Sequence, residues 1–303
     1  MFDEFKSAFQ RPNNAHIQLI IINVVIFLAM GVLMVTAKIS GADGLFQFVY
    51  DQFSIPPQIT LFFSKPWTII TYSFAHHFNY ENSYADIFHI LFNMLALYWF
   101  GRIFVEYLGS NKLVALYILG ALVGGLLYLF MFNTIPFFIE RSEFSGMVGA
   151  SAAVYAVMFA TATLLPNYTF FLLFFGPVKI KYIAFFYIVI SFLGSVGSNA
   201  GGNLAHLGGA LIGFVYIKQL QAGVDWGSWI TVTLDWFRNL FKTKSKVKVT
   251  YRSEDQKTKK AVKVPFSKTS QGEIDAILDK ISDRGYESLT KEEKERLFNA
   301  SKK

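Results

Sequence analysis

The chain has 303 residues, of which 53% are hydrophobic, 17% aromatic and only 16% charged. A soluble domain carries about a quarter charged residues, so this composition excludes an ordinary soluble fold and indicates an all-α membrane protein with several spans. The chain contains no cysteine, which excludes disulfides, thiolate metal sites and a cysteine nucleophile. We expect neither a metal nor another cofactor.

Six apolar runs predict transmembrane helices. The first, at 17–37, is long enough to cross a hydrocarbon core of about 30 Å. It lacks a small-residue cleavage site, so we expect a retained helix and not a signal peptide. A later run at 170–175 is too short to span and is expected to lie in the membrane interface. The other five spans are predicted at 86–104, 113–132, 147–165, 182–196 and 202–220.

Lysine and arginine are unevenly divided between the two sides of this predicted topology, and the richer side should be cytoplasmic. Both termini then lie inside. The net charge of +7 is concentrated after the last span. A nucleic-acid-binding arm is one interpretation, but a basic segment so close to a membrane helix favours contact with anionic lipid. We therefore expect the lipid bilayer, and no nucleic acid, as its partner.

Four regions follow from these patterns. Residues 1–15 form a cytoplasmic N-terminal segment and 16–220 the membrane domain. Residues 221–269 contain an interfacial amphipathic stretch at 226–241 and a basic linker. In 270–303, apolar residues at helical spacing, a stop at Gly285 and a capping box of Thr290 and Glu293 predict a small cytoplasmic helical hairpin. This hairpin is a candidate binding site for a cytoplasmic partner.

Three polar residues share one predicted depth. The second, fourth and sixth helices all run from outside to inside, and His89, Ser151 and His206 each fall about one turn inside them. At 1.5 Å per residue, all three should lie roughly 5–10 Å below the outer face. An ionisable residue within a span indicates function. The alternative is that each histidine is merely hydrogen-bonded between helices and that the small residues around Ser151 serve packing.

Glycines offer a way to join two of these residues. Gly209 and Gly213 form a GxxxG face that lets the sixth helix approach another backbone closely. If the partner is the helix of Ser151, its hydroxyl reaches His206, which can act as general base and then protonate a leaving amine. Tyr155, one turn deeper, either stacks on the imidazole of His206 or is an ordinary packed aromatic.

An acyl transfer also needs hydrogen-bond donors for the developing oxyanion. His89 and Asn93 stand at i and i+4, so both project from one face of the second helix. Together with the backbone N–H of Ser151, they are candidates for this role. No aspartate is placed to orient His206, so the residues predict a Ser–His dyad and not a triad.

This set of motifs resembles the rhomboid family of intramembrane serine proteases, in order and in the six-helix plan, over about residues 16–220. The similar elements are Pro66-Trp67-Thr68-Ile69-Ile70-Thr71 with Phe74 and His76, His89 with Asn93-Met94, Gly101 with Glu106-Tyr107-Leu108-Gly109-Ser110-Asn111-Lys112, Gly149-Ala150-Ser151 with Tyr155, and Asn203 with Ala205-His206-Leu207-Gly208-Gly209.

The resemblance implies a six-transmembrane-helix rhomboid-like bundle with a water-filled cavity open to the outside. It implies Ser151 as nucleophile and His206 as base, with oxyanion donors from His89, Asn93 and the Ser151 amide. The supporting positions are Tyr155, Gly149, Asn203 and Gly209.

Three features depart from the family pattern. Ala152 replaces the last glycine of GxSG, which adds one methyl group at a close helix contact and should be tolerated. Thr68 follows Trp67 where the family has arginine. Residues 77–85 resemble an insertion before the second helix.

The leading hypothesis is an intramembrane serine endopeptidase that cleaves single-pass membrane proteins near the outer face. The alternative is a catalytically silent rhomboid-like protein that binds membrane clients for trafficking or quality control. A proton-relaying transporter is a third reading, but no internal repeat supports it. Because no transit peptide precedes the first span, we expect a bacterial cytoplasmic membrane.

Overall fold

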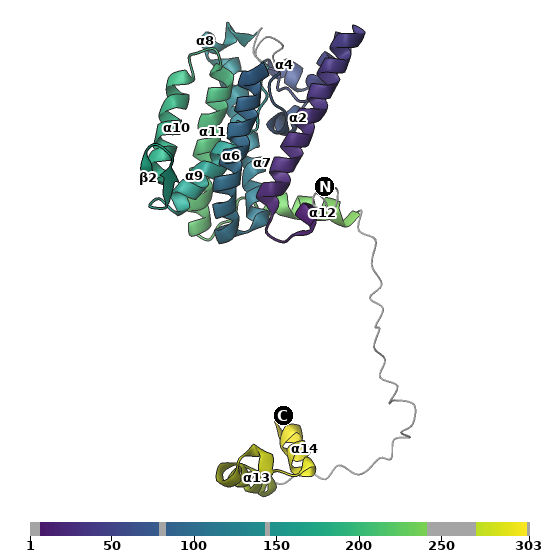
Figure 1. Cartoon of the computed structure of the whole chain (residues 1–303), viewed down its shortest axis with the longest axis vertical. Coiled ribbons are helices and arrows are strands. Elements are labelled where there is room, and N and C mark those ends of the chain that lie inside the picture. Colours follow the sequence, from purple (N-terminus) through teal and green to yellow (C-terminus); the bar gives the residue numbers. More distant parts are fainter. Residues whose placement is uncertain (1–6, 79–82, 143–145, 241–270, 302–303) are drawn as a thin grey trace. The chain divides into compact units, whose positions relative to one another are not determined.

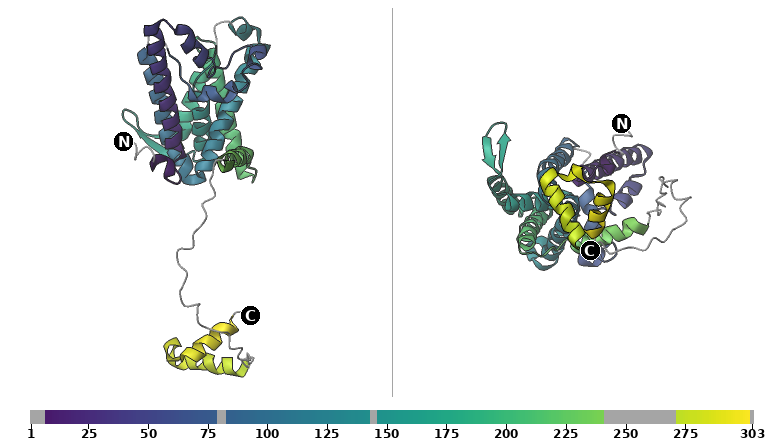
Figure 2. Two further views of the ribbon diagram at one scale, coloured as in Figure 1. Left: turned by 90° about the vertical axis from the view of Figure 1, so that its right-hand side faces the viewer. Right: turned by 90° about the horizontal axis from the view of Figure 1, so that it is seen from below.

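The computed structural model describes residues 7–78, 83–142, 146–240 and 271–301. The chain divides into two compact units, Met1–Lys242 and Thr243–Lys303, which are described separately. The first unit is a bundle of upright helices with shorter elements at its ends and edge (Figures 1 and 2). In its described residues, 271–301, the second contains two α-helices and a short 3₁₀ helix.

Six helices of the first unit correspond to the predicted spans. Of the helices in the described part of the chain, four are long and apolar enough to cross a membrane, whereas α9 and α10 have only 14 and 15 residues. The chain is an all-α polytopic membrane protein, and the count of six spans stays a prediction. The six helices are α2 (Ala15–Ser40), α6 (Ser83–Leu108), α7 (Ser110–Thr134), α9 (Ser151–Leu164), α10 (Ile180–Gly194) and α11 (Ala200–Gln221).

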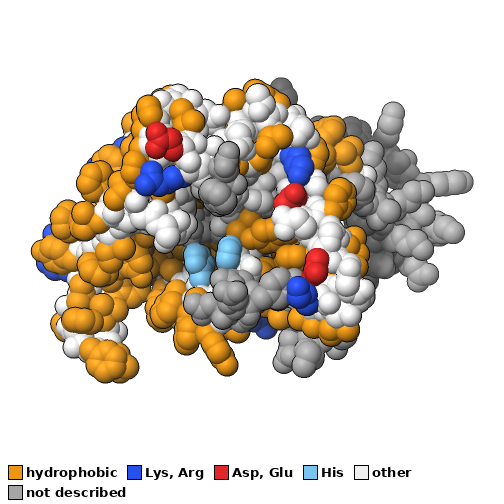
Figure 3. Space-filling model, turned by 90° about the horizontal axis from the view of Figure 1, so that it is seen from above, with side chains coloured by type: hydrophobic (Ala, Val, Ile, Leu, Met, Phe, Trp, Pro, Cys, Tyr) orange, Lys and Arg blue, Asp and Glu red, His pale blue; other side chains and the backbone are white. Residues whose placement is uncertain are grey.

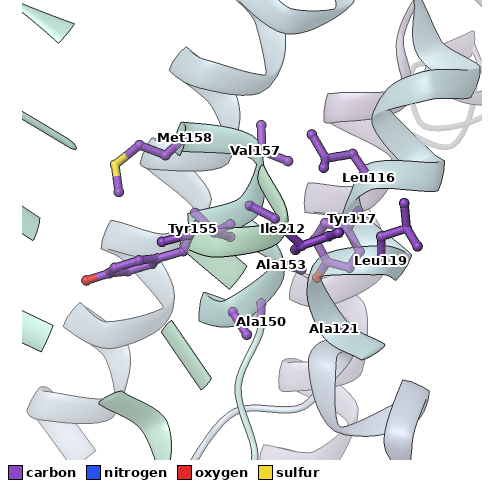
Figure 4. Close-up of a cluster of buried hydrophobic side chains, with 14 of the residues drawn as sticks. Leu116, Tyr117, Leu119, Ala121, Ala150, Ala153, Tyr155, Val157, Met158 and Ile212 are labelled. Carbon is purple, nitrogen blue, oxygen red and sulfur yellow. The ribbon is translucent and has the colours of Figure 1, made fainter. Parts of the chain in front are cut away.

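The outer helices turn large apolar side chains away from the protein. Phe88, Phe130 and Phe185 are 55%, 59% and 67% exposed, as suits a surface in contact with lipid tails. By contrast, α9 lies within the bundle and packs against α11, α7, α6 and α10. Figure 4 shows Ala153 of α9 on the side that faces α7, with Tyr155 pointing the other way. The short, alanine-rich α9 is therefore the centre of the core.

The segment before α9 is not helical. Met147 pairs with Ile55 of the first loop through two backbone hydrogen bonds of 2.9 and 3.0 Å, and the Gly149 N–H donates to the carbonyl of Tyr72. Gly149 has a φ of 142°, which is strained for a residue with a Cβ. The predicted start of the fourth helix at 147 is therefore wrong, because the first loop pairs with this segment in an extended form.

A buried polar network fixes the first loop to the helices. The Tyr72 hydroxyl donates to the carbonyl of Ala121 in α7 at 2.7 Å. The Tyr117 hydroxyl donates to the carbonyl of Ser73 at 2.6 Å and accepts from the Asn23 amide of α2 at 3.1 Å. Unpaired polar groups are costly in an apolar interior, so these bonds specify where the loop lies.

The remaining elements of the first unit are short. The run at 170–175 belongs to an antiparallel hairpin of β1 (Thr169–Leu172) and β2 (Gly176–Lys179), and its location in the membrane interface stays a prediction. The amphipathic stretch predicted after the last span forms α12 (Ser228–Leu240), on which Trp229 and Trp236 are exposed. The others are α3 (Asp43–Tyr50), α4 (Ile59–Phe62), α5 (Thr68–Thr71), η1 (Tyr72–Phe74) and α8 (Pro136–Ile139).

The second unit contains α13 (Gln271–Arg284), η4 (Tyr286–Ser288) and α14 (Lys291–Ala300). Gly285, with a φ of 77°, follows α13 as predicted. The predicted capping box is also present, since Thr290 and Glu293 satisfy each other's backbone N–H groups. The predicted basic linker at 242–269 lies outside the described residues, as do residues 79–82 of the predicted insertion.

Glu293 provides a pH-dependent link between α13 and α14. A hydrogen bond from Lys280, and a second from the backbone N–H of Thr290, lower the pKa of the Glu293 carboxyl to about 2. The unfolded pKa of a glutamate is about 4.3, so this stabilisation is present above about pH 4 and is lost as the pH falls through 2.

We expect ¹³C NMR of the full chain to give a titration midpoint near 2 for the Glu293 carboxyl, and Lys280→Ala to move this midpoint toward 4.3. An unchanged midpoint in Lys280→Ala would contradict the assignment.

Candidate active site

The structure brings Ser151 and His206 into direct contact. Ser151 is the first residue of α9, and His206 lies on α11. The Ser151 Oγ and the His206 Nε2 are 2.7 Å apart, which is the distance of a hydrogen bond from a hydroxyl to an imidazole. Two residues 55 positions apart in sequence therefore form a hydroxyl–imidazole pair.

His89, Ser151 and His206 lie around one cavity, as predicted, but Ser151 does not have the predicted position about one turn inside its helix. His89 and His206 each lie six residues after the first residue of α6 (Ser83) and α11 (Ala200), about 9 Å along the axis at 1.5 Å per residue. Ser151 starts its helix and does not lie one turn inside it. The segment before α9 is extended and not helical, and it is this segment that reaches into the bundle and places Ser151 there.

Glycines on α11 allow the close approach. A Cβ on Gly209 would collide with the carbonyl oxygen of Ala152, and one on Gly213 would collide with that of Ala156. Since backbone atoms cannot turn aside as a long side chain can, both positions require glycine. The predicted GxxxG contact is therefore present and faces α9.

His89 and Asn93 of α6 face the same cavity as the pair. A cavity of about 180 Å³ is lined by both of these residues and by Ser151, Tyr155 and His206. The Asn93 side-chain amide donates one hydrogen to the carbonyl of His89 at 2.9 Å, and its second hydrogen is left for a ligand. The N–H of Ser151 adds a third donor, since the first N–H groups of a helix have no intrahelical acceptor.

A second cavity leads from this site. It has a volume of about 370 Å³ and is lined by Ser151 and His89 and also by polar residues such as His77, Asp86 and Asn199. Figure 3 views the end of the bundle at which α4 and α8 lie, and histidine side chains are visible near the middle of that face. The resemblance implied a water-filled cavity open to the outside, which stays a prediction for this polar cavity.

Tyr155 stacks on the imidazole of His206, with ring centroids 4.2 Å apart and an interplanar angle of 14°. Of the two alternatives for Tyr155, stacking on His206 and ordinary packing, the structure has the stacking. The Tyr155 hydroxyl accepts a hydrogen bond of 2.9 Å from Ser191, whose Oγ is also 3.2 Å from the His206 Nδ1. Ser191 was not predicted, although it is the single serine or threonine of α10.

Gly149 lies close to the Ser151 hydroxyl, and Asn203 lies on α11 three residues before His206. A Cβ on Gly149 would stand 3.5 Å from the Ser151 Oγ. The Asn203 amide donates to the carbonyl of Gly194 at 3.0 Å, which ties the end of α10 to α11. His76, a residue of the rhomboid-like motif that was not predicted as part of the site, is 1% exposed and lies with its ring centroid 6.2 Å from that of His89.

A family model described as the rhomboid domain matches residues 64–221, which is 158 of the 303 residues. The chain belongs to the rhomboid family. This rhomboid is 35% identical over 167 residues to the "RHOMBOID-like protein 12, mitochondrial" of Arabidopsis thaliana, covering 52% of this chain and 47% of that protein. It is 29% identical over 152 residues to the "Rhomboid protein 1, mitochondrial" of Saccharomyces cerevisiae, covering 47% and 41%.

The chain aligns with less than half the length of both curated relatives. Both are named as mitochondrial, so they lend no support to the bacterial cytoplasmic membrane expected from the sequence. The C-terminal residues 267–303 match a separate family of unknown function (DUF6576). The rhomboid match therefore ends before the second unit begins.

Two departures of this rhomboid from the family pattern are accommodated by its neighbours. The methyl group of Ala152 lies against Gly124 of α7, where a Cβ would come within 2.7 Å of it. The carbonyl group of Ala152, and not its methyl group, contacts α11 at Gly209. Thr68 is fully buried and its hydroxyl donates to the carbonyl of Lys65 at 2.6 Å, so that position holds no charge.

Proposed function

We propose that this rhomboid is an intramembrane serine endopeptidase that acts through the Ser151–His206 dyad. The observation that carries the proposal is the 2.7 Å contact between the Ser151 Oγ and the His206 Nε2, within a cavity that donors from α6 also line. A hydroxyl paired with an imidazole is the arrangement that activates a serine nucleophile.

The reaction begins when the His206 Nε2 takes the proton of the Ser151 hydroxyl as the Oγ attacks the scissile carbonyl carbon. Negative charge then develops on the carbonyl oxygen, and the Ser151 N–H, Asn93 and His89 stabilise it. His206 gives the proton to the leaving amine, which departs and leaves an acyl group on Ser151. A water molecule, deprotonated by His206, hydrolyses this ester and restores the hydroxyl.

The surroundings of the dyad favour an apolar substrate. An apolar cavity of about 440 Å³ lies between α6, α10 and the β-hairpin and shares Phe92, Ala96 and Tyr187 with the cavity of the dyad. A transmembrane segment of a single-pass protein has the apolar side chains to occupy it. The segment must unwind to present an extended peptide, so residues that weaken a helix should favour cleavage. The proposal holds for whichever membrane contains the protein.

A fluorophosphonate probe tests whether Ser151 is activated. The purified full-length protein in detergent should form one covalent adduct, mapped to Ser151 by mass spectrometry, because only an activated serine attacks such a phosphorus centre. Ser151→Ala and His206→Ala should abolish labelling, and Ser195→Ala, which alters a serine bonded to the backbone of Phe192, should not. Absence of labelling in the wild type, together with retained binding of a single-span protein, would favour the silent, client-binding alternative.

Asn93 tests the oxyanion site. We expect Asn93→Leu to lower kcat by about 10²–10³-fold, with little change in KM, because the lost donor acts on the transition state. Thr163→Val is a matched control. It removes a bond from the Thr163 hydroxyl to the carbonyl of Phe159 four residues earlier, the same kind that Asn93 makes to His89. A kcat for Asn93→Leu equal to that of the control would remove Asn93 from the mechanism.

A further inference from the structure

Ser191 is buried on a helix that mainly faces outward. Its side chain is fully buried, although the adjacent Ile190 and Phe192 are 47% and 66% exposed. The other buried residues of α10 are Ile180 and Ala184. Spacings of four and seven residues place all three on one helix face, so α10 turns Ser191 toward α9 and α11.

The contacts of Ser191 favour one nitrogen of His206 as the one that carries the proton. Its Oγ lies 2.9 Å from the Tyr155 hydroxyl, to which it donates, and 3.2 Å from the His206 Nδ1. A serine has one hydroxyl proton. With that proton directed at Tyr155, the Oγ presents a lone pair to Nδ1, which must then be the protonated nitrogen. The Nε2 is left with a free lone pair, 2.7 Å from the Ser151 Oγ.

We propose that Ser191 is a positioning residue for the dyad: it accepts the Nδ1–H of His206 and thereby holds Nε2 in the form and direction needed to take the Ser151 proton. The inference rests on the proposed protease function. Tyr155 completes the chain, because its ring stacks on the imidazole while its hydroxyl accepts the Ser191 proton.

A hydroxyl in this place suits a membrane-embedded site. The orienting group of a triad is normally a carboxylate, but an ionised side chain within a bilayer is costly. Ser191 provides an acceptor for Nδ1–H without burying a charge. A neutral hydrogen bond is weaker than one to a carboxylate, so its removal should have a smaller effect than the loss of the aspartate from a triad.

The tautomer of His206 is the first test, and it requires no activity. In full-length protein labelled with ¹⁵N-histidine, the His206 signal is identified by its loss in His206→Gln. We expect a protonated Nδ1 and an unprotonated Nε2 in the wild type and a mixture of tautomers in Ser191→Ala. A protonated Nε2 in the wild type, or an identical spectrum in Ser191→Ala, would overturn the proposal.

Kinetics are the second test. Ser191→Ala should lower kcat about tenfold with KM unchanged, as the loss of one neutral hydrogen bond implies. Ser191→Thr, which keeps the oxygen, should restore most of the rate, and Ser195→Ala on the same helix end should match the wild type. A wild-type kcat in Ser191→Ala, or an effect on KM alone, would contradict the role.

Tyr155→Phe separates the ring of Tyr155 from its hydroxyl. We expect a loss smaller than that of Ser191→Ala, because the stacked ring remains. The double variant should be no slower than Ser191→Ala alone, since the Tyr155 hydroxyl acts through Ser191. Fully multiplicative effects would contradict this order of contacts. If the wild type cleaves nothing, the protease proposal fails, and the tautomer measurement still decides the role of Ser191.

Discussion

Alanine in place of Ser151 or His206 is expected to lower kcat for a single-span substrate by about 10⁴-fold or more. Catalytic groups that act as a unit lose nearly all of their effect when one is removed, and the 2.7 Å contact makes these two residues such a unit. The measurement is the rate of appearance of cleaved product from a reconstituted substrate, normalised to protein that elutes as a folded species.

The double variant provides the sharper result. Ser151→Ala with His206→Ala should be no slower than either single variant, because the imidazole has no hydroxyl to activate once Ser151 is gone. Ser195→Ala serves as the control for loss of a serine hydroxyl from the bundle. Proteolysis that persists in both single variants would rule out the dyad.

Gly209→Ala is expected to lower kcat by about 10²-fold while the protein remains folded. The new Cβ would meet the carbonyl of Ala152, so α11 must move away from α9 and carry His206 with it. A misplacement of about 1 Å can cost a factor of this size, and overpacking typically costs about 1–3 kcal/mol in stability. The measurements are kcat and the thermal unfolding temperature in the same detergent.

Gly31→Ala is the matched control for this variant. Gly31 lies on α2, where a Cβ would stand 3.5 Å from a ring carbon of Phe78, an ordinary contact. It makes the same chemical change in a membrane helix without moving the dyad, so activity should match the wild type. Wild-type kcat in Gly209→Ala would show that the spacing of α9 and α11 tolerates a methyl group and does not set the rate.

The contact between Ser151 and His206 could be predicted because membrane packing leaves a local pattern. Two glycines four residues apart mark a close helix contact, and His206 stands three residues before the first of them. The side of α11 that contacts α9 could therefore be predicted from Gly209 and Gly213. His89 and Asn93 followed from the same helical periodicity.

The start of α9 and the role of Ser191 could not be predicted from the sequence, for two different reasons. Met147 begins an apolar run and resembles a helix start, but a backbone pairing with Ile55, far away in sequence, holds it extended. Ser191 is a lone hydroxyl in an apolar helix, and such residues usually bond within their own helix. Only the packing of α10 against α11 directs it to the Nδ1 of His206.

The division of the dyad between α9 and α11 has a consequence for biogenesis. At a synthesis rate of about 5–20 residues per second, the 55 residues that separate Ser151 from His206 take roughly 3–11 s to make. During that time the nascent chain carries the hydroxyl without its base. Under the proposed protease function, the protein cannot attack neighbouring newly inserted proteins until its last bundle helix has entered the membrane and docked, so the order of the helices along the chain delays the onset of activity.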